Sequence, residues 1–153
     1  MKEVKGNIWD YHKKGHWIVI TTNGTIKANG EAVMGRGIAL QAKQRFSGLP
    51  LMLGRKTSKY GNVPYILPEF RLVTLPVKHN WWEQADVRLI ADEIAQLGRA
   101  WTLWDNKLSL YLVRPGCGNG RLDWKDVKPV LEKYLDDRFI VVEKEVTNER
   151  DRN

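Results

Sequence analysis

The run Trp-Ile-Val-Ile-Thr-Thr at residues 17–22 is the feature that most constrains the fold of this chain. It is almost continuously apolar and rich in β-branched side chains, which is typical of a strand buried on both faces. Such strands belong to parallel or mixed sheets whose two faces are both covered by helices. The run therefore predicts an α/β fold, with residues 17–22 in the interior of the sheet.

Segments with strand character alternate with segments of helical character along the rest of the chain. Residues 37–46 carry an imperfect apolar stripe, residues 81–104 have apolar side chains at helical spacing, and residues 123–135 follow a plausible N-cap, Asp123. Further strands are expected at residues 4–8, 63–67, 70–75, 107–113 and 139–146. This alternation predicts a three-layer α/β/α sandwich around a mixed, largely parallel sheet.

The length of 153 residues suits one domain, which we place at residues 1–146, followed by a polar tail at 147–153. A composition of 42% hydrophobic and 28% charged residues is typical of a soluble globular protein. No apolar run approaches the roughly 20 residues needed to span a bilayer, and the first ten residues do not resemble a signal peptide. The single cysteine, Cys117, excludes an internal disulfide, so we expect a reducing, cytoplasmic environment.

The formal net charge of +7 predicts an attraction to anions such as nucleic acid, phosphorylated ligands or acidic proteins. The basic residues are scattered, with no block of five like charges, so most of them are expected on the solvated surface. Most of the seven tryptophans are expected to fill the core, although one or two could stack on a nucleobase. Contact with nucleic acid therefore stays open.

Two glycine-rich segments each stand between a predicted strand and a predicted helix. The first glycine loop, residues 33–39, reads Val-Met-Gly-Arg-Gly-Ile-Ala, and the second, residues 115–120, reads Pro-Gly-Cys-Gly-Asn-Gly. Ligands of such sheets bind at the carboxyl ends of the strands, where backbone N–H groups and helix N-termini attract phosphate.

Each glycine loop alone could be only a tight connection between two elements. Two of them at one edge of the sheet could clamp a diphosphate from both sides, which favours phosphate binding. Neither loop is a Walker A motif, because no Gly-Lys-Ser/Thr follows. Neither is a GxGxxG fingerprint, since Leu40 stands at the third glycine position of the first loop.

The order of Gly6-Asn7-Ile8, a buried strand ending at Asn23, and the two glycine loops resembles the macro domain family. The branch that it resembles most holds the macro domain of the DNA ADP-ribosyl glycohydrolase antitoxin DarG and the terminal ADP-ribose protein glycohydrolase. Residues 116–128, GCGNGRLDWKDVK, are the most specific part, and the resemblance covers about residues 4–146. It implies the macro domain fold and ADP-ribose as the ligand.

The resemblance also implies roles for individual residues. Asn7 and Ile8 would lie near the adenine, where many macro domains carry Asp at the first position, and Asn23 would face the distal ribose. Lys78 matches a lysine that some members of the branch use for catalysis. The diphosphate would lie against Gly35, Arg36, Gly37 and Ile38, and the other phosphate and distal ribose against Gly116, Cys117, Gly118, Asn119 and Gly120.

The chain also departs from this branch. Residues 23–32 form a longer segment than the branch leads us to expect, so the distal-ribose loop could differ. Gly120 stands where some glycohydrolases of the branch carry an acid, which counts against a protein-linked aspartate or glutamate as substrate and agrees better with the DarG-like pattern.

Other reactive residues have plainer explanations. Lys78 could be a surface lysine, but as a neutral amine it could attack an anomeric carbon, and as a cation it could stabilise a leaving group. Cys117 fits among glycines by its small size, although a thiol is also a possible nucleophile. His79 could assist Lys78 in proton transfer. With His12, His16 and one cysteine, no metal spacing is evident, so we expect neither a metal nor a cofactor.

The leading hypothesis is an ADP-ribosyl hydrolase that removes ADP-ribose from a modified macromolecule, a DNA base or a protein, by means of Lys78. One alternative is a phosphatase acting on ADP-ribose-1″-phosphate, held by Asn23 and the second glycine loop. Another is a reader that binds ADP-ribose without chemistry. A nucleic-acid-binding protein of another kind is the fourth possibility, and its mark would be a steeply salt-dependent affinity.

Overall fold

The computed structural model describes residues 1–145 and contains one six-stranded sheet with the strand order β1-β6-β5-β2-β4-β3. The first five strands of this order run parallel, and β3 pairs antiparallel with β4. The strands are β1 (Lys2–Gly6), β2 (Trp17–Asn23), β3 (Ile66–Leu67), β4 (Leu72–Lys78), β5 (Leu110–Val113) and β6 (Phe139–Lys144). The mixed, largely parallel sheet predicted from the sequence is confirmed.

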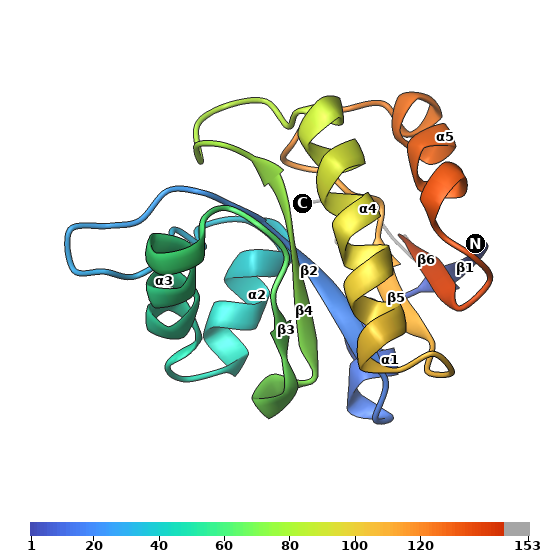
Figure 1. Cartoon of the computed structure of the whole chain (residues 1–153), viewed down its shortest axis with the longest axis horizontal. Coiled ribbons are helices and arrows are strands. Elements are labelled where there is room, and N and C mark those ends of the chain that lie inside the picture. The colour runs from blue at the N-terminus through green and yellow to red at the C-terminus, as the bar shows by residue number, and fades with distance from the viewer. Residues whose placement is uncertain (146–153) are drawn as a thin grey trace.

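Helices cover both faces of this sheet, which gives the three predicted layers. They are α1 (Ile8–Lys13), α2 (Gly37–Arg45), α3 (Leu49–Tyr60), α4 (Val87–Trp104) and α5 (Trp124–Tyr134), with a short 3-10 turn η1 (Pro68–Phe70). In Figure 1, α2 and α3 lie on one side of the sheet and α4 and α5 on the other. No helix in residues 1–145 is long and apolar enough to cross a membrane.

The central strand β2 shows why both faces need covering. Ile18 and Ile20 pack into the apolar layer shared with α1, α2 and α3, whereas Val19 between them packs into the layer shared with α4 and α5. All three side chains are at most 1% exposed. The alternation follows from the two-residue period of a strand, and it confirms the double burial predicted for residues 17–22.

The strand predicted at residues 4–8 is wrong in its second half. Strand β1 ends at Gly6, and Asn7 is the N-cap of α1, its Oδ1 accepting a hydrogen bond of 2.9 Å from the backbone N–H of Trp9. Ile8 is therefore the first residue of a helix. A helix of only six residues is too short for its apolar period to stand out in a sequence.

The helix predicted at residues 81–104 begins only at Val87. Asp86 accepts hydrogen bonds from the backbone N–H groups of Arg88 and Leu89 and thereby starts the helix, so Trp81 and Trp82 lie in the preceding loop. Asp123 stands at the N-cap position of α5, as predicted, although its side chain makes no capping hydrogen bond.

Several strands have other boundaries in the structure than the sequence predicts. The strand predicted at 63–67 shrinks to β3, the one at 70–75 shifts to β4 and the one at 107–113 to β5, while α3 was not predicted. The strand predicted at 139–146 is β6 as far as Lys144. Residue 146 and the tail predicted at 147–153 lie outside the described residues.

Candidate functional site

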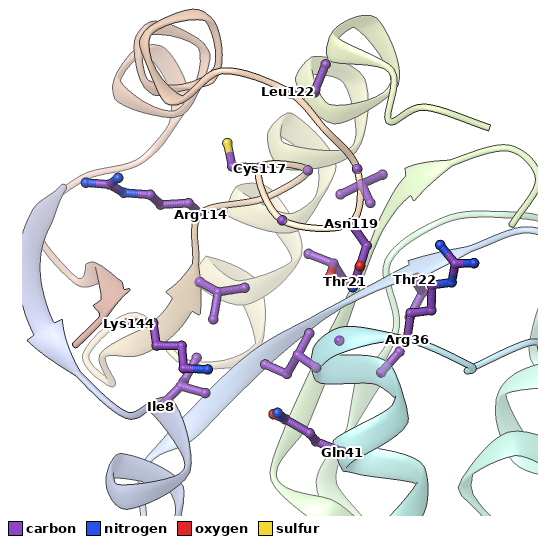
Figure 2. Close-up of a pocket in the computed structure, with 18 of the residues that line it drawn as sticks. Ile8, Thr21, Thr22, Arg36, Gln41, Arg114, Cys117, Asn119, Leu122 and Lys144 are labelled. Atoms are coloured by element: carbon purple, nitrogen blue, oxygen red, sulfur yellow. The ribbon is translucent and has the colours of Figure 1, made fainter. Parts of the chain in front are cut away.

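A cavity of about 1060 Å³ opens at the carboxyl ends of the parallel strands (Figure 2). Every residue that the sequence singled out as catalytic or ligand-binding lines it. These are Asn7, Ile8, Asn23, Gly35, Arg36, Gly37, Ile38, Lys78, Gly116, Cys117, Gly118, Asn119 and Gly120. They come from five segments of the chain, and the parallel sheet brings them together because it gathers strand ends at one edge.

The first glycine loop leads directly into α2. Gly37 has a φ of +56° and is the first residue of the helix, while Arg36 is its N-cap and makes no side-chain capping bond. The first backbone N–H groups of α2 therefore have no capping side chain, and they carry the partial positive charge of a helix N-terminus. A nine-residue helix that starts at the cavity wall suits the binding of an anionic group there.

The second glycine loop is folded back on itself more tightly than any side chain would allow. A Cβ on Gly120 would lie 2.5 Å from the carbonyl oxygen of Gly116 and 2.7 Å from Cβ of Ala85. Gly116 has a φ of +74°, and its carbonyl also accepts a hydrogen bond of 2.9 Å from the N–H of Leu122. Gly116 and Gly120 are therefore required by the geometry of the loop.

Lys78 is the last residue of β4, and its amine lies next to the second glycine loop. Its Nζ donates long hydrogen bonds to the carbonyl oxygens of Trp81 at 3.3 Å and Asn119 at 3.5 Å. Partial burial lowers the pKa of Lys78, and the positive charges of Arg121 and Arg36 lower it further. Within residues 1–145 it forms no ion pair with a carboxylate, so its environment favours the neutral amine more than a surface site does.

Asn23 ends the strand next to Lys78, and the two residues are register partners. The Asn23 amide braces the long loop that follows: its Nδ2 donates to the carbonyl of Val33 at 3.0 Å, and its Oδ1 accepts from the N–H of Thr25 at 2.9 Å. The side chain therefore holds both ends of this loop together at the cavity wall. Contact with a distal ribose remains a prediction.

Asn7 and Ile8 line the end of the cavity beside α1, where Figure 2 shows the side chain of Lys144 next to Ile8. Gln41 also points into this end from α2, and its Oε1 accepts a 2.7 Å hydrogen bond from Nε1 of Trp9. Sequence reasoning missed Gln41. The signal was present, because Gln41 lies four residues after Gly37 and so shares a helix face with it.

The wall formed by Arg114 was also missed. Its guanidinium forms an ion pair with Glu143 at 3.5 Å and lies 5.0 Å from the ring centre of Trp124. The indole N–H of Trp124 in turn donates to Glu3 at 3.1 Å. Arg114 directly follows β5, and the other side chains come from β6, α5 and β1, so no local pattern in the sequence connects them.

The cysteine and histidine side chains are weaker candidates for chemistry than Lys78. Cys117 lines the cavity, but burial raises the pKa of its thiol, which disfavours the nucleophilic thiolate. His79 pairs with Asp86 at 3.2 Å, and Nε2 of His12 lies 2.8 Å from the carbonyl of Phe70 on the far side of α1. In the described part of the chain, no group of three or more His, Cys, Asp or Glu side chains could hold a metal ion.

Comparison with known proteins gives matches among solved structures. The chain is 24% identical to the macrodomain of Thermus aquaticus DarG, with a TM-score of 0.71, covering 95% of this chain and 97% of that one. For the macrodomain of Mycobacterium tuberculosis DarG the identity is 23%, the TM-score 0.68 and the coverage 83% and 88%. No protein-family model matches the sequence, and no curated protein matches it.

A third match is the structure of Thermosipho africanus DarTG in complex with ADP-ribose, with 18% identity and a TM-score of 0.71. It covers 96% of this chain but only 42% of that one, so the chain corresponds to less than half of that protein. At these identities the similarity concerns the fold alone.

Proposed function

The chain has the macro domain fold, and we propose that it binds ADP-ribose in the cavity at the carboxyl ends of its strands and hydrolyses an ADP-ribosyl bond there. The observation that carries this proposal is the position of the Lys78 amine in the cavity that both glycine loops line, next to the second of them. The match to a DarTG structure that contains ADP-ribose adds support for the ligand.

The cavity has the chemistry that a nucleoside diphosphate sugar requires. Its volume of about 1060 Å³ lies just above the usual range of about 300–1,000 Å³ for small-molecule sites. The diphosphate would lie between the N-terminus of α2 and the exposed amides of the second glycine loop, the base near Asn7 and Ile8, and the distal ribose near Asn23 and Lys78. Each part of the ligand then meets groups of matching polarity.

Lys78 would supply the chemistry at the distal ribose. The neutral amine attacks the anomeric carbon C1″ and forms a C–N bond while the bond from C1″ to the modified macromolecule breaks. The bonding electron pair leaves with the macromolecule, which takes up a proton, and the lysine nitrogen loses one. Water then adds at C1″, the C–N bond breaks with return of a proton to Lys78, and ADP-ribose is released.

The substrate would be a modified macromolecule, a DNA base or a protein. Trp81 lines the cavity and is 45% exposed, and the adjacent Trp82 is 61% exposed, so flat apolar surface is available at the mouth. The net charge of +7 favours a polyanionic substrate over a protein that has few acidic residues. Gly120 in place of an acid agrees with a substrate other than an aspartyl or glutamyl ester.

One observation favours a second candidate, the phosphatase acting on ADP-ribose-1″-phosphate. Within residues 1–145 the charged groups that act on Lys78 are two arginines, a setting that would also suit a terminal phosphate at the distal end of the cavity. In that reaction water attacks phosphorus, the P–O bond to the ribose breaks, and inorganic phosphate is released. Phosphate release from this compound, tested against Lys78→Ala and Asn23→Ala, separates the two reactions.

The first experiment is calorimetric titration with ADP-ribose, with AMP as the control ligand. Binding at micromolar strength or better, far tighter than AMP, supports the proposed ligand. Turnover is then measured on an ADP-ribosylated single-stranded oligonucleotide, an ADP-ribosylated protein and ADP-ribose-1″-phosphate. Tight binding of ADP-ribose with no turnover of any of these compounds would show that the chain is a reader, which binds ADP-ribose without chemistry. If ADP-ribose gives neither heat nor a thermal shift, it is excluded as the ligand. Salt-dependent binding to nucleic acid would then be measured.

A further inference from the structure

Trp9 uses both of its N–H groups to orient side-chain amides at the end of the cavity beside α1. Its backbone N–H donates to Oδ1 of Asn7 at 2.9 Å, and its indole Nε1–H donates to Oε1 of Gln41 at 2.7 Å. All three residues line the cavity. An N–H group can donate to the oxygen of an amide but not to its nitrogen, so each bond determines which way round the amide lies.

Trp9 is itself held from several sides. Its side chain is buried, and the guanidinium of Arg45 lies 4.2 Å from its ring centre while donating to the backbone carbonyl of Gln41 at 3.3 Å. The rings of His12 and Phe46 pack against it with centroid distances of 5.6 and 6.1 Å. A ring packed in this way keeps one orientation, so the directions of its two N–H groups are fixed.

Both amides therefore present donors to a ligand. Their oxygens are turned toward Trp9, and within residues 1–145 neither Nδ2 of Asn7 nor Nε2 of Gln41 donates a hydrogen bond to the protein. In Figure 2, Gln41 and Lys144 both reach toward the space beside Ile8. The ammonium group of Lys144 is also a donor and has no acceptor atom.

The acidic side chains of the cavity are engaged in ion pairs. Among residues 1–145, two carboxylates line it: Glu143 pairs with Arg114 at 3.5 Å, and Asp123 pairs with Lys125 at 3.8 Å. Glu143 directly precedes Lys144 on β6, so the two side chains leave opposite faces of the sheet. The side chains that meet beside α1 thus supply donors where an exocyclic amine would need an acceptor.

Purine bases differ at the edge that such donors would meet. Guanine presents two neighbouring acceptors, O6 and N7, whereas adenine presents N7 beside an amino group that donates. We propose that this end of the cavity binds a purine that carries a carbonyl group at position 6, as hypoxanthine and guanine do, in preference to adenine. Two amide donors match two acceptors, whereas the amino group of adenine would face one of the donors. The inference rests on the proposed function, because it takes the ligand to be a nucleoside diphosphate ribose in this cavity.

The test compares ADP-ribose by calorimetry with its analogue in which hypoxanthine replaces adenine. The two ligands differ in the group at position 6 and in the proton at N1, and share everything else. We expect the hypoxanthine analogue to bind about 5- to 150-fold more tightly, which is the range for a matched pair of hydrogen bonds to a base edge. Equal affinities, or tighter binding of ADP-ribose, would overturn the proposal.

Two variants exchange a donor for an acceptor. Asn7→Asp and Gln41→Glu each keep an oxygen for the bond to Trp9 and replace the NH2 group by a second oxygen. Each should reduce the preference for hypoxanthine, and the double variant should favour ADP-ribose. The added negative charge repels the diphosphate of both ligands alike, so it cancels in the ratio of affinities. Gln44→Glu, exposed on α2 and outside the cavity lining, is the matched control and should leave the ratio unchanged.

Trp9→Phe tests whether the indole sets the direction of the Gln41 amide. The variant loses the indole N–H but keeps the backbone N–H that bonds to Asn7, so the amide of Gln41 becomes free to turn its oxygen toward the base. We expect a smaller preference for hypoxanthine in W9F, with thermal unfolding as the check that the protein is folded. An unchanged ratio in folded W9F would show that Trp9 does not determine the base.

The two proposals fail in different ways. If neither nucleotide binds, the proposed function is lost, and the base preference is lost with it. If ADP-ribose binds at least as tightly as the hypoxanthine analogue, ADP-ribose binding stands and the base preference is overturned. A preference for hypoxanthine that N7D and Q41E leave unchanged also overturns the inference, because other groups would then recognise the base.

Discussion

Gly37 and Asn119 approach each other so closely at the cavity that a side chain at position 37 would displace the amide of Asn119. A Cβ built on Gly37 would lie 2.8 Å from the amide nitrogen Nδ2 of Asn119, well inside van der Waals contact. Figure 2 shows Asn119 reaching from the second glycine loop toward α2. The space between the two glycine loops, where the diphosphate would lie, is therefore kept open by the absence of a side chain at Gly37.

Gly37→Ala should weaken ADP-ribose binding and lower the free energy of unfolding by about 1 kcal/mol, because φ is +56° and Asn119 must move aside. Calorimetry and urea unfolding measure the two effects. Gly35→Ala is the control for stability, since its Cβ would meet nothing within 4 Å. In an Asn119→Ala background the steric part should vanish and only the backbone strain remain, and equal effects of G37A in both backgrounds would contradict this account.

Gly120→Ala should destabilise the protein by about 2–3 kcal/mol, since its Cβ would overlap backbone atoms that cannot turn away. Gly118→Ala in the same loop is the matched control, because a Cβ there has open space around it. Thermal and urea unfolding of both variants measure the difference. Equal stability of G120A and G118A would mean that the loop is looser than described.

Lys78→Ala should abolish most turnover, by at least about 100-fold, while leaving ADP-ribose affinity within a few-fold of the parent. Lys78→Arg distinguishes the two roles open to the lysine, because it keeps the charge but cannot become a neutral nucleophile. We expect K78R to be as inactive as K78A. Substantial activity of K78R would assign Lys78 a purely electrostatic role.

Asn7→Asp should raise the affinity for ADP-ribose. Oδ1 of Asn7 is taken by the N–H of Trp9, so its other side-chain atom is an amide nitrogen, which cannot accept from the exocyclic amine of adenine. A carboxylate would keep the cap of α1 and supply that acceptor. Calorimetry with ADP-ribose and with its hypoxanthine analogue measures the effect, and a gain for both ligands alike would show that residue 7 does not contact this edge of the base.

Glu93→Gln should stabilise the protein increasingly as the pH rises. Glu93 is 7% exposed, and its Oε2 has no hydrogen-bond partner among residues 1–145. Burial, followed by the charge of Asp92, raises its pKa. The folded chain thus holds a proton that the unfolded chain releases above a pKa of about 4.3. Glu93 therefore makes stability fall with rising pH through the interval between its unfolded and folded pKa values.

Urea unfolding at pH 4, 5.5 and 8 measures this effect. The stability difference between E93Q and the parent should grow across the series, and the exposed Glu132→Gln on α5 serves as the control. A difference that stays constant with pH would contradict this account, because it would show that Glu93 has the same pKa in the folded and in the unfolded protein.

The sequence was sufficient to predict a mixed sheet and the two glycine loops that line the cavity, because both are visible as local patterns. Doubly buried strands such as β2 are apolar throughout, and the glycine loops are visible as clusters. The wall built by Arg114, Trp124 and Glu143 depends on which strands are neighbours, and no single segment encodes that. The assignment of ADP-ribose came from the resemblance of motif order, since glycine loops alone indicate only an anion.

Helix α3 shows why some elements escaped prediction. Gly54 lies in its middle, where a glycine usually argues against a helix. In the structure a Cβ at this position would collide with the carbonyl of Gly30, so the helix packs directly on the backbone of the loop between β2 and α2. The glycine serves a tertiary contact, and tertiary contacts override local propensity.

The pairing of β1 with β6 has a consequence for how the molecule assembles. Residues 2–6 have β6 as their sheet neighbour, so they must wait for residues 139–144, at the other end of the described chain. Contacts of such long sequence separation form slowly, and during synthesis the amino-terminal strand leaves the ribosome long before its partner. Asn7 and Ile8 follow β1 directly, so we expect the end of the cavity beside α1 to be completed only after β6 has been synthesised.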